Sequence, residues 1–147
     1  MIIFKNKNNY LKIDLLSLED DKTLPSYEDA RIMISVFSNE FFGKNASWVS
    51  AKSFKEFCSN LIALEKNRFG EAALKSMSQD ELDLKIFSVD SLGHIGIKGL
   101  IGHNIFSENI SFHHCIKFGF EFDPSQLITA VKESWVKQNA GPSTATF

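Results

Sequence analysis

Histidine and cysteine are the residue types in this chain that could ligate a metal. His113, His114 and Cys115 are consecutive, and His94 and His103 precede them. Neighbouring side chains of a strand point to opposite faces, so His113 and Cys115 share a face that His114 does not. There is no CxxC pair and no HxxxH on a helical stretch, whereas zinc normally takes three or four such ligands. The sequence predicts no metal and no cofactor, and leaves open whether the histidines have a role beyond structure.

Nucleophilic and acid–base catalysis also lack a recognisable set of residues. Cys58 lies on the apolar stripe of an expected helix, where a thiol is buried and inert, and no serine lies in a GxSxG turn. Asp80, Glu81, Asp83 and Asp90 could form a carboxylate dyad. Asp83, however, is expected on the solvent side of a strand, and no partner base is recognisable. We therefore predict that the protein is not an enzyme.

Glycine recurs every three residues at positions 93, 96, 99 and 102. A phosphate-binding loop would need a helix directly after it, and this segment reads as strand and turn. The glycines are interpreted as sites of backbone bending and close strand packing.

The composition excludes several classes of protein. Sixteen basic and eighteen acidic residues give a formal charge of -2, and only Arg31 and Arg68 are arginines, which argues against a nucleic-acid reader. No apolar run approaches the roughly 18 residues of a membrane span, and no signal peptide is visible at the N-terminus. Two cysteines, 58 and 115, without CxxC spacing suit reduced, packed thiols. We expect a cytoplasmic protein with no membrane partner.

The hydrophobic pattern predicts which elements position these residues. Alternation of period two predicts strands over 10–18, 30–36, 41–49, 82–86, 95–97 and 110–122, with a short strand around Leu74. Glycine and asparagine at 43 and 45 are expected to bend or bulge the third of these. Apolar residues at helical spacing from Phe54 to Ile62 predict a helix that begins at Ser50 or Ser53 and ends with Gly70 in the left-handed conformation. Asp123 and Pro124 open a last helix with Leu127, Ile128, Val131 and Trp135 on its apolar stripe.

These elements predict an α+β fold. We expect antiparallel sheet of about six to seven strands packed with two α-helices, in the order β-β-β-α-β-β-β-β-α. A single domain is expected over residues 1–139, with a flexible tail over 140–147.

The strand over 110–122 has the clearest pattern. One face carries Ile110, Phe112, His114, Ile116, Phe118, Phe120 and Phe122. The favoured interpretation is a core stripe, with His114 as a hydrogen-bonded core histidine. The other is the wall of a ligand cavity.

Acidic residues gather in the predicted loop between the first two strands. They are Glu19, Asp20, Asp21, Glu28 and Asp29. Such residues are commonly solvated loop charges, but they could also form an acidic face for a basic partner. They are our candidates for partner binding.

Several segments together resemble a known family. The segments are 69–74 (FGEAAL), Leu82-x-Leu84, 93–99 (GHIGIKG), the pair Phe54 and Phe57, and Phe120-x-Phe122-Asp123. They resemble the WapI-like immunity proteins of bacteria over residues 10–138, and the chain departs from the family pattern at Leu100 to Asn109. The resemblance implies a protein that binds and neutralises a cognate toxin domain.

Two further functions stay open at this level. A small-molecule-binding protein or enzyme would have its pocket between the helices and the phenylalanine-rich sheet face. A homo-oligomer would show a large apolar surface patch or an unpaired strand edge. The sequence leaves monomer and homodimer undecided.

Overall fold

The computed structural model describes residues 1–141, which form two four-stranded antiparallel sheets and three helices. The strands are β1 (Ile2–Asn6), β2 (Asn9–Leu18), β3 (Ala30–Ser38), β4 (Phe41–Val49), β5 (Glu71–Lys75), β6 (Leu82–Ser88), β7 (Ile95–Phe106) and β8 (Ser111–Phe122). The helices are α1 (Ala51–Asn67), α2 (Gln126–Ala130) and α3 (Ser134–Asn139). Strands β1–β4, in that order, form the N-terminal sheet, and β5–β8 form the C-terminal sheet.

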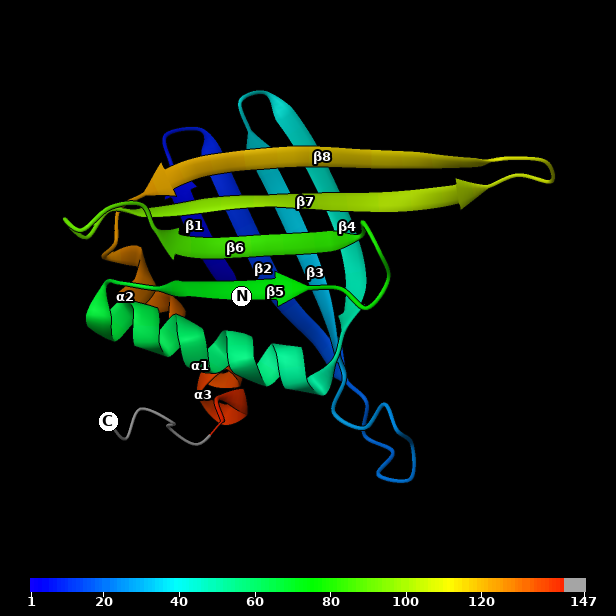
Figure 1. The fold of residues 1–147 in the computed structure, drawn as a ribbon, viewed down its shortest axis with the longest axis horizontal. Helices are drawn as coiled ribbons and strands as arrows, with labels where there is room; N and C mark the ends of the chain where they lie inside the picture. The colour runs from blue at the N-terminus through cyan, green and yellow to red at the C-terminus, as the bar shows by residue number, and fades with distance from the viewer. Residues whose placement is uncertain (142–147) are drawn as a thin grey trace.

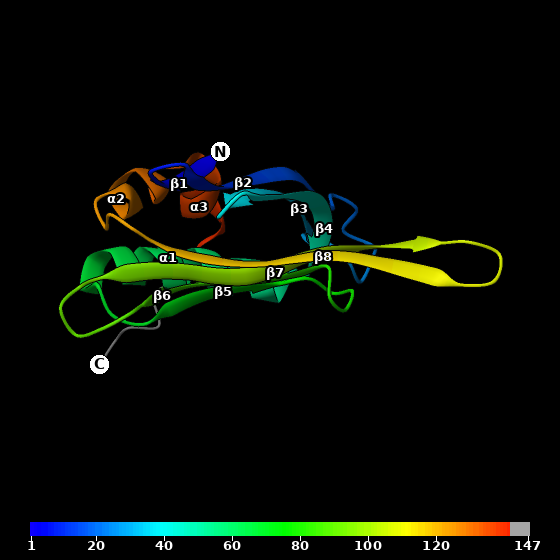
Figure 2. The ribbon, with the colours of Figure 1, turned by 90° about the horizontal axis from the view of Figure 1, so that it is seen from above.

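The two sheets lie face to face in two layers, and their strands cross steeply (Figures 1 and 2). Helix α1 runs along β5 and covers that edge of the C-terminal sheet, while α2 and α3 lie beside the layer of the N-terminal sheet (Figure 2). The sheet edge formed by β8 crosses near the ends of β1, β3 and β4. Each sheet therefore buries only its inner face, and the two inner faces share one core.

The core follows from the period-two pattern of the strands. In β3, every second residue from Ala30 to Ser38 is buried, and the residues between them are more exposed. In β2, Leu11 and Ile13 are fully buried, and a register shift between Leu15 and Ser17 ends the alternation. No such shift occurs between β3 and β4, so the bulge expected at positions 43–45 is absent from this pairing.

Helix α1 occupies the position that its apolar stripe predicts. Ser50 is the N-cap, and its hydroxyl accepts a hydrogen bond from the Ser53 backbone N–H at 3.2 Å. The helix ends at Arg68, which adopts the left-handed conformation with φ of 55° and donates its N–H to Leu64. The prediction that Gly70 takes this position is wrong, because the helix closes two residues earlier.

The order of elements differs from the prediction in two places. Strand β1 precedes β2 and was not predicted. Ile2 and Phe4 face the core, but Ile3 between them is also apolar and is 37% exposed, so the residue types do not alternate. The last helix is divided into α2 and α3. Trp135 of α3 stacks on Phe54 of α1 with ring centroids 5.7 Å apart.

The phenylalanine-rich face of β8 packs against the N-terminal sheet rather than against the helices. Phe122 is buried with its ring centroid 4.4 Å from that of Phe4 in β1, and Phe118 and Phe120 pack against the same core. Strands, not helices, therefore cover the face at which the alternative function would have its pocket.

The end of the described chain is attached to α1. Ala140 packs against the core, and the Gly141 backbone N–H donates to the Ser59 hydroxyl at 2.8 Å. The rest of the predicted tail, 142–147, lies outside the described residues. None of the helices within residues 1–141 is both long and apolar enough to span a membrane.

Candidate partner-binding surfaces

The β7–β8 hairpin extends well beyond the sandwich (Figures 1 and 2). Its register is continuous from Ile95 opposite Phe122 to Phe106 opposite Ser111. We call residues 95–102 and 115–122 its inner part and residues 103–114 its outer part. The inner part packs in the sheet, whereas the outer part projects into solvent.

Exposure along one face of β8 changes steadily from the body to the tip. Phe122 is 4% exposed, Phe118 and Phe120 are half-buried, and Phe112 is 52% exposed. His114 lies between the half-buried and exposed phenylalanines and is itself exposed, so the prediction of a core histidine is wrong. The alternation is real, but the N-terminal sheet ends before it reaches this part of the strand.

The projecting end is apolar. Ile105, Phe106, Ile110 and Phe112 are all at least half exposed, and Phe106 reaches 77%. At the start of β4, Phe41 and Phe42 are 65% and 58% exposed. The four exposed apolar residues at the hairpin end form a group of the kind that another protein commonly covers.

The hairpin is fixed to the body by close backbone packing. A Cβ on Gly102 would lie 2.4 Å from the Asp80 carbonyl oxygen, and one on Gly99 would lie 2.6 Å from that of Asp83. The Asn45 amide of β4 also donates to the Gly102 carbonyl at 2.5 Å. These glycines permit close approach of neighbouring backbone, as the sequence predicts.

A hollow of about 190 Å³ lies where β4 meets the hairpin, lined among others by Phe42, Lys44, His114 and Ile116. Pockets for small ligands typically measure about 300–1,000 Å³. The hollow suits a single side chain of a partner better than a whole ligand. A wider depression of about 520 Å³ on the outer face of the C-terminal sheet is lined by Lys85, Lys98 and Lys117 with Asp83.

The predicted acidic residues all lie at one loop, between β2 and β3, but in different environments. Asp20 and Asp21 are exposed, and Glu19 is half-buried. Hydrogen bonds from the Thr23 hydroxyl and backbone N–H lower the pKa of Asp21. These hydrogen bonds favour the ionised form of the exposed Asp21 carboxyl.

The other two acidic residues make contacts within the protein. Glu28 forms an ion pair with Lys55 of α1, and the hydrogen bond from Lys55 lowers the pKa of this carboxyl. Asp29 is 8% exposed and accepts the Ala51 backbone N–H at 2.8 Å, so it caps the start of α1. Neither arrangement could be read from the sequence, because both partners are more than twenty residues away.

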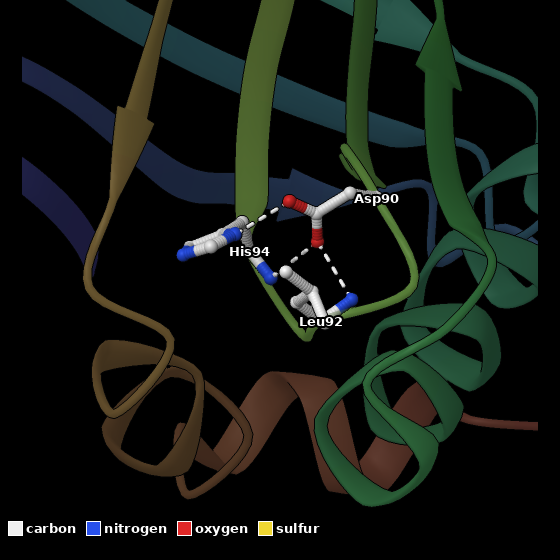
Figure 3. A network of polar contacts seen from close by, with 3 residues as sticks. All are labelled: Asp90, Leu92 and His94. Carbon is white, nitrogen blue, oxygen red and sulfur yellow. Dashed lines mark hydrogen bonds and ion pairs between the residues drawn. The ribbon is translucent and has the colours of Figure 1, made fainter.

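The best-defined polar network involves Asp90 and His94 in the β6–β7 turn (Figure 3). Asp90 Oδ2 lies 2.5 Å from His94 Nδ1, and Asp90 Oδ1 accepts the backbone N–H groups of Leu92 and His94 at 2.8 and 3.3 Å. The hydrogen bond between the side chains raises the pKa of His94 and lowers that of Asp90. Because the carboxylate also holds the turn, its geometry is that of a structural contact. It is not half of the carboxylate dyad that the sequence allows.

The two cysteines differ in environment. Burial raises the pKa of the Cys58 thiol to about 12, as expected for an inert core residue. Cys115 is exposed on β8, contrary to the prediction of two packed thiols. Within residues 1–141 no cluster of three or more His, Cys, Asp or Glu side chains is placed to hold a metal ion.

Comparison with protein families decides the relationship. The family model described as the immunity protein WapI-like family matches residues 1–134. The chain belongs to the WapI-like immunity protein family. The WapI-like match includes β1 and the whole β7–β8 hairpin, so the segment from Leu100 to Asn109 lies within the family domain. Membership in this family supports an immunity function in general.

Further comparisons give no second line of evidence: no curated protein and no solved structure matches this WapI-like chain. The feature that sequence reasoning missed is the apolar hairpin end. One signal was available: residues 99–107 and 109–116 contain no Lys, Arg, Asp or Glu, which is unusual for a projecting hairpin.

Proposed function

We propose that this protein is a cytoplasmic immunity protein that binds a cognate toxin domain and neutralises it without catalysing a reaction. The observation that carries the proposal is the family match over residues 1–134. The acidic loop supports it, because it offers a charged surface that a protein partner could cover.

The acidic loop is the part of this surface that we assign to a basic toxin. Asp20 and Asp21 are exposed, and Glu19 stands beside them at the base of the loop. Charged groups at the rim of an interface chiefly accelerate encounter with a partner of opposite charge. Glu28 and Asp29 contribute indirectly, because they attach the loop to α1.

The test of the function is protection of cells. The candidate toxin domain encoded by the neighbouring gene is expressed in a susceptible host with and without this protein. Protection, together with co-purification of the two proteins as one complex, is the expected result. Survival that does not depend on the protein, or failure to protect despite normal expression, would contradict the proposal.

The role of the loop is tested by charge reversal. Asp20→Lys with Asp21→Lys should lower the rate of association with the toxin domain about tenfold at low salt, and the loss should shrink as salt is added. A matched control reverses two exposed acids elsewhere, Glu71→Lys with Asp83→Lys, and should leave the rate unchanged. Equal effects of the two pairs would show that only net charge matters.

A further inference from the structure

The outer edge of β8 divides into a closed and an open stretch. In β8, alternate residues direct their backbone N–H and C=O groups away from β7. Gly119 and Glu121 do so, and the residues with odd numbers therefore form the outward-facing set. The Ser38 hydroxyl donates to the Gly119 carbonyl at 3.4 Å, and the Asn6 amide donates to the Glu121 carbonyl at 2.7 Å. The N-terminal sheet therefore closes this end of the edge.

The open stretch comprises Ser111, His113, Cys115 and Lys117. Among the residues that the structure describes, no hydrogen bond is made to the outward backbone groups of these four. Edge strands are usually protected by charged side chains, proline, bulges or a covering element. Here Lys117 is the only charged residue of the stretch, residues 109–116 contain no Lys, Arg, Asp, Glu or Pro, and the register with β7 has no shift.

We propose that this open stretch pairs with the same stretch of a second copy of the chain. Antiparallel pairing around a two-fold axis at His114 places Ser111 opposite Lys117 and His113 opposite Cys115 of the other copy. All four open residues are then used, and the pairing ends where the closed stretch of the neighbour begins. The two C-terminal sheets become one eight-stranded sheet.

The same register also covers exposed apolar side chains. Phe112 becomes the cross-strand neighbour of Ile116 in the other copy, on the face that bears the hollow lined by Ile116, His114 and Phe42. Each copy therefore directs Phe112 toward the hollow of its neighbour. Phe41 is opposite Ser38 in the β3–β4 register and is 65% exposed, so it lies beside the closed end of the same edge.

A second copy suits this edge because the match is symmetric in both length and chemistry. His114, through which the two-fold axis passes, is the middle residue of the open stretch. On the face that bears the hollow, each apolar side chain meets an apolar side chain of the other copy. No like-charged lysine or carboxylate pair is brought together, because Lys117 faces Ser111. The inference does not depend on toxin binding, which we assign to the acidic loop.

The first test is the oligomeric state of the full chain. Sedimentation velocity and light scattering from about 1 to about 500 µM should show the mass rising from 16.6 kDa toward twice that value. Cys115→Pro removes an outward N–H without removing a β7–β8 hydrogen bond, and should remain monomeric throughout. Cys115→Ser, the matched control, keeps the N–H and should dimerise like the wild type. Circular dichroism checks that both variants are folded.

The second test concerns the register. His113→Cys places a thiol opposite Cys115 of the other copy, at a spacing that a disulfide can bridge, so mild oxidation should give a covalent dimer. Ser111→Cys faces Lys117 and should give much less. A wild-type protein that stays monomeric at about 500 µM, a proline variant that dimerises normally, or equal cross-linking of both cysteine variants would each overturn the proposal.

Discussion

The inner and outer parts of the β7–β8 hairpin share one register but differ in what lies across from them. Both are regular antiparallel strand, and both alternate apolar and polar side chains on β8. The N-terminal sheet covers the hollow-side face of the inner part, and within the described chain it reaches the outer part only at the hollow beside His103 and His114. An alternating pattern therefore encodes a strand with an apolar face, whereas burial of that face depends on a second element.

The largest contrast should appear in amide hydrogen exchange. Ile97 and Phe120 pair in the inner part, and Ile105 and Phe112 pair in the outer part. The outer pair lacks a core behind it, so it should open locally and exchange roughly 1,000-fold faster than the inner pair. Exchange is followed by NMR in dilute protein. Equal protection of the two pairs would show that the hairpin opens only with global unfolding.

Replacing phenylalanine by alanine should destabilise the protein far more in the inner part than in the outer part. Phe122→Ala removes a buried ring packed on Phe4, and should lower the free energy of unfolding by about 3–5 kcal/mol. Phe112→Ala changes the same face of the same strand, but its effect should stay within about 0.5 kcal/mol. Urea unfolding of both variants at low protein concentration measures the difference. A large effect at Phe112 would mean that the outer part is buried in the monomer.

The boundary between the two parts is tested at Gly102. An alanine Cβ there would lie 2.4 Å from the Asp80 backbone oxygen, so Gly102→Ala should cost about 1–3 kcal/mol. Ser111→Ala, in the exposed outer part, serves as the control and should be nearly neutral. Thermal unfolding of the two variants gives the comparison. If Gly102→Ala proved neutral, the contact between the β5–β6 loop and the hairpin would be looser than the structure indicates.

The smallest effect concerns the turn at the start of the inner part. Because Asp90 raises the pKa of His94, the stabilisation from His94 is complete below the ordinary histidine pKa and is lost as pH rises through the raised value. The pKa of Asp90 is lowered, so its stabilisation is present above the ordinary aspartate value and is lost as pH falls through the lowered one. Asp90→Asn should lower the pKa of His94 in an NMR titration. An unchanged His94 titration would rule out the contact.

Much of the fold could be predicted from local patterns. The buried faces of β2 and β3 follow from strict alternation, and α1 from its apolar stripe and the Ser50 cap. The predictions at β1 and at the C-terminus of α1 failed for local reasons. Ile3 adds an apolar residue on the outer face, and Arg68 takes a left-handed conformation that the residue type does not favour.

The candidate site was less predictable than the fold. The acidic loop was predicted from its composition, but no local pattern indicates that Glu28 pairs with Lys55 or that Asp29 caps α1. The hairpin end was interpreted as core because its side chains are phenylalanine and isoleucine. Apolar side chains favour burial, and contact with a partner chain buries them as well as contact within the same chain does.

The amino-acid sequence alone predicts the strand and helix periods, the placement of most turns and, through the family relationship, the immunity class. These properties depend on residues close together in the chain, or on sequence motifs that can be recognised without the tertiary structure. Tertiary contacts determine that the two sheets cross, that β8 extends beyond the sheet that covers it, and that Ser38 and Asn6 close half of its edge. Those outcomes depend on contacts across more than eighty residues of chain, which local periodicity does not encode.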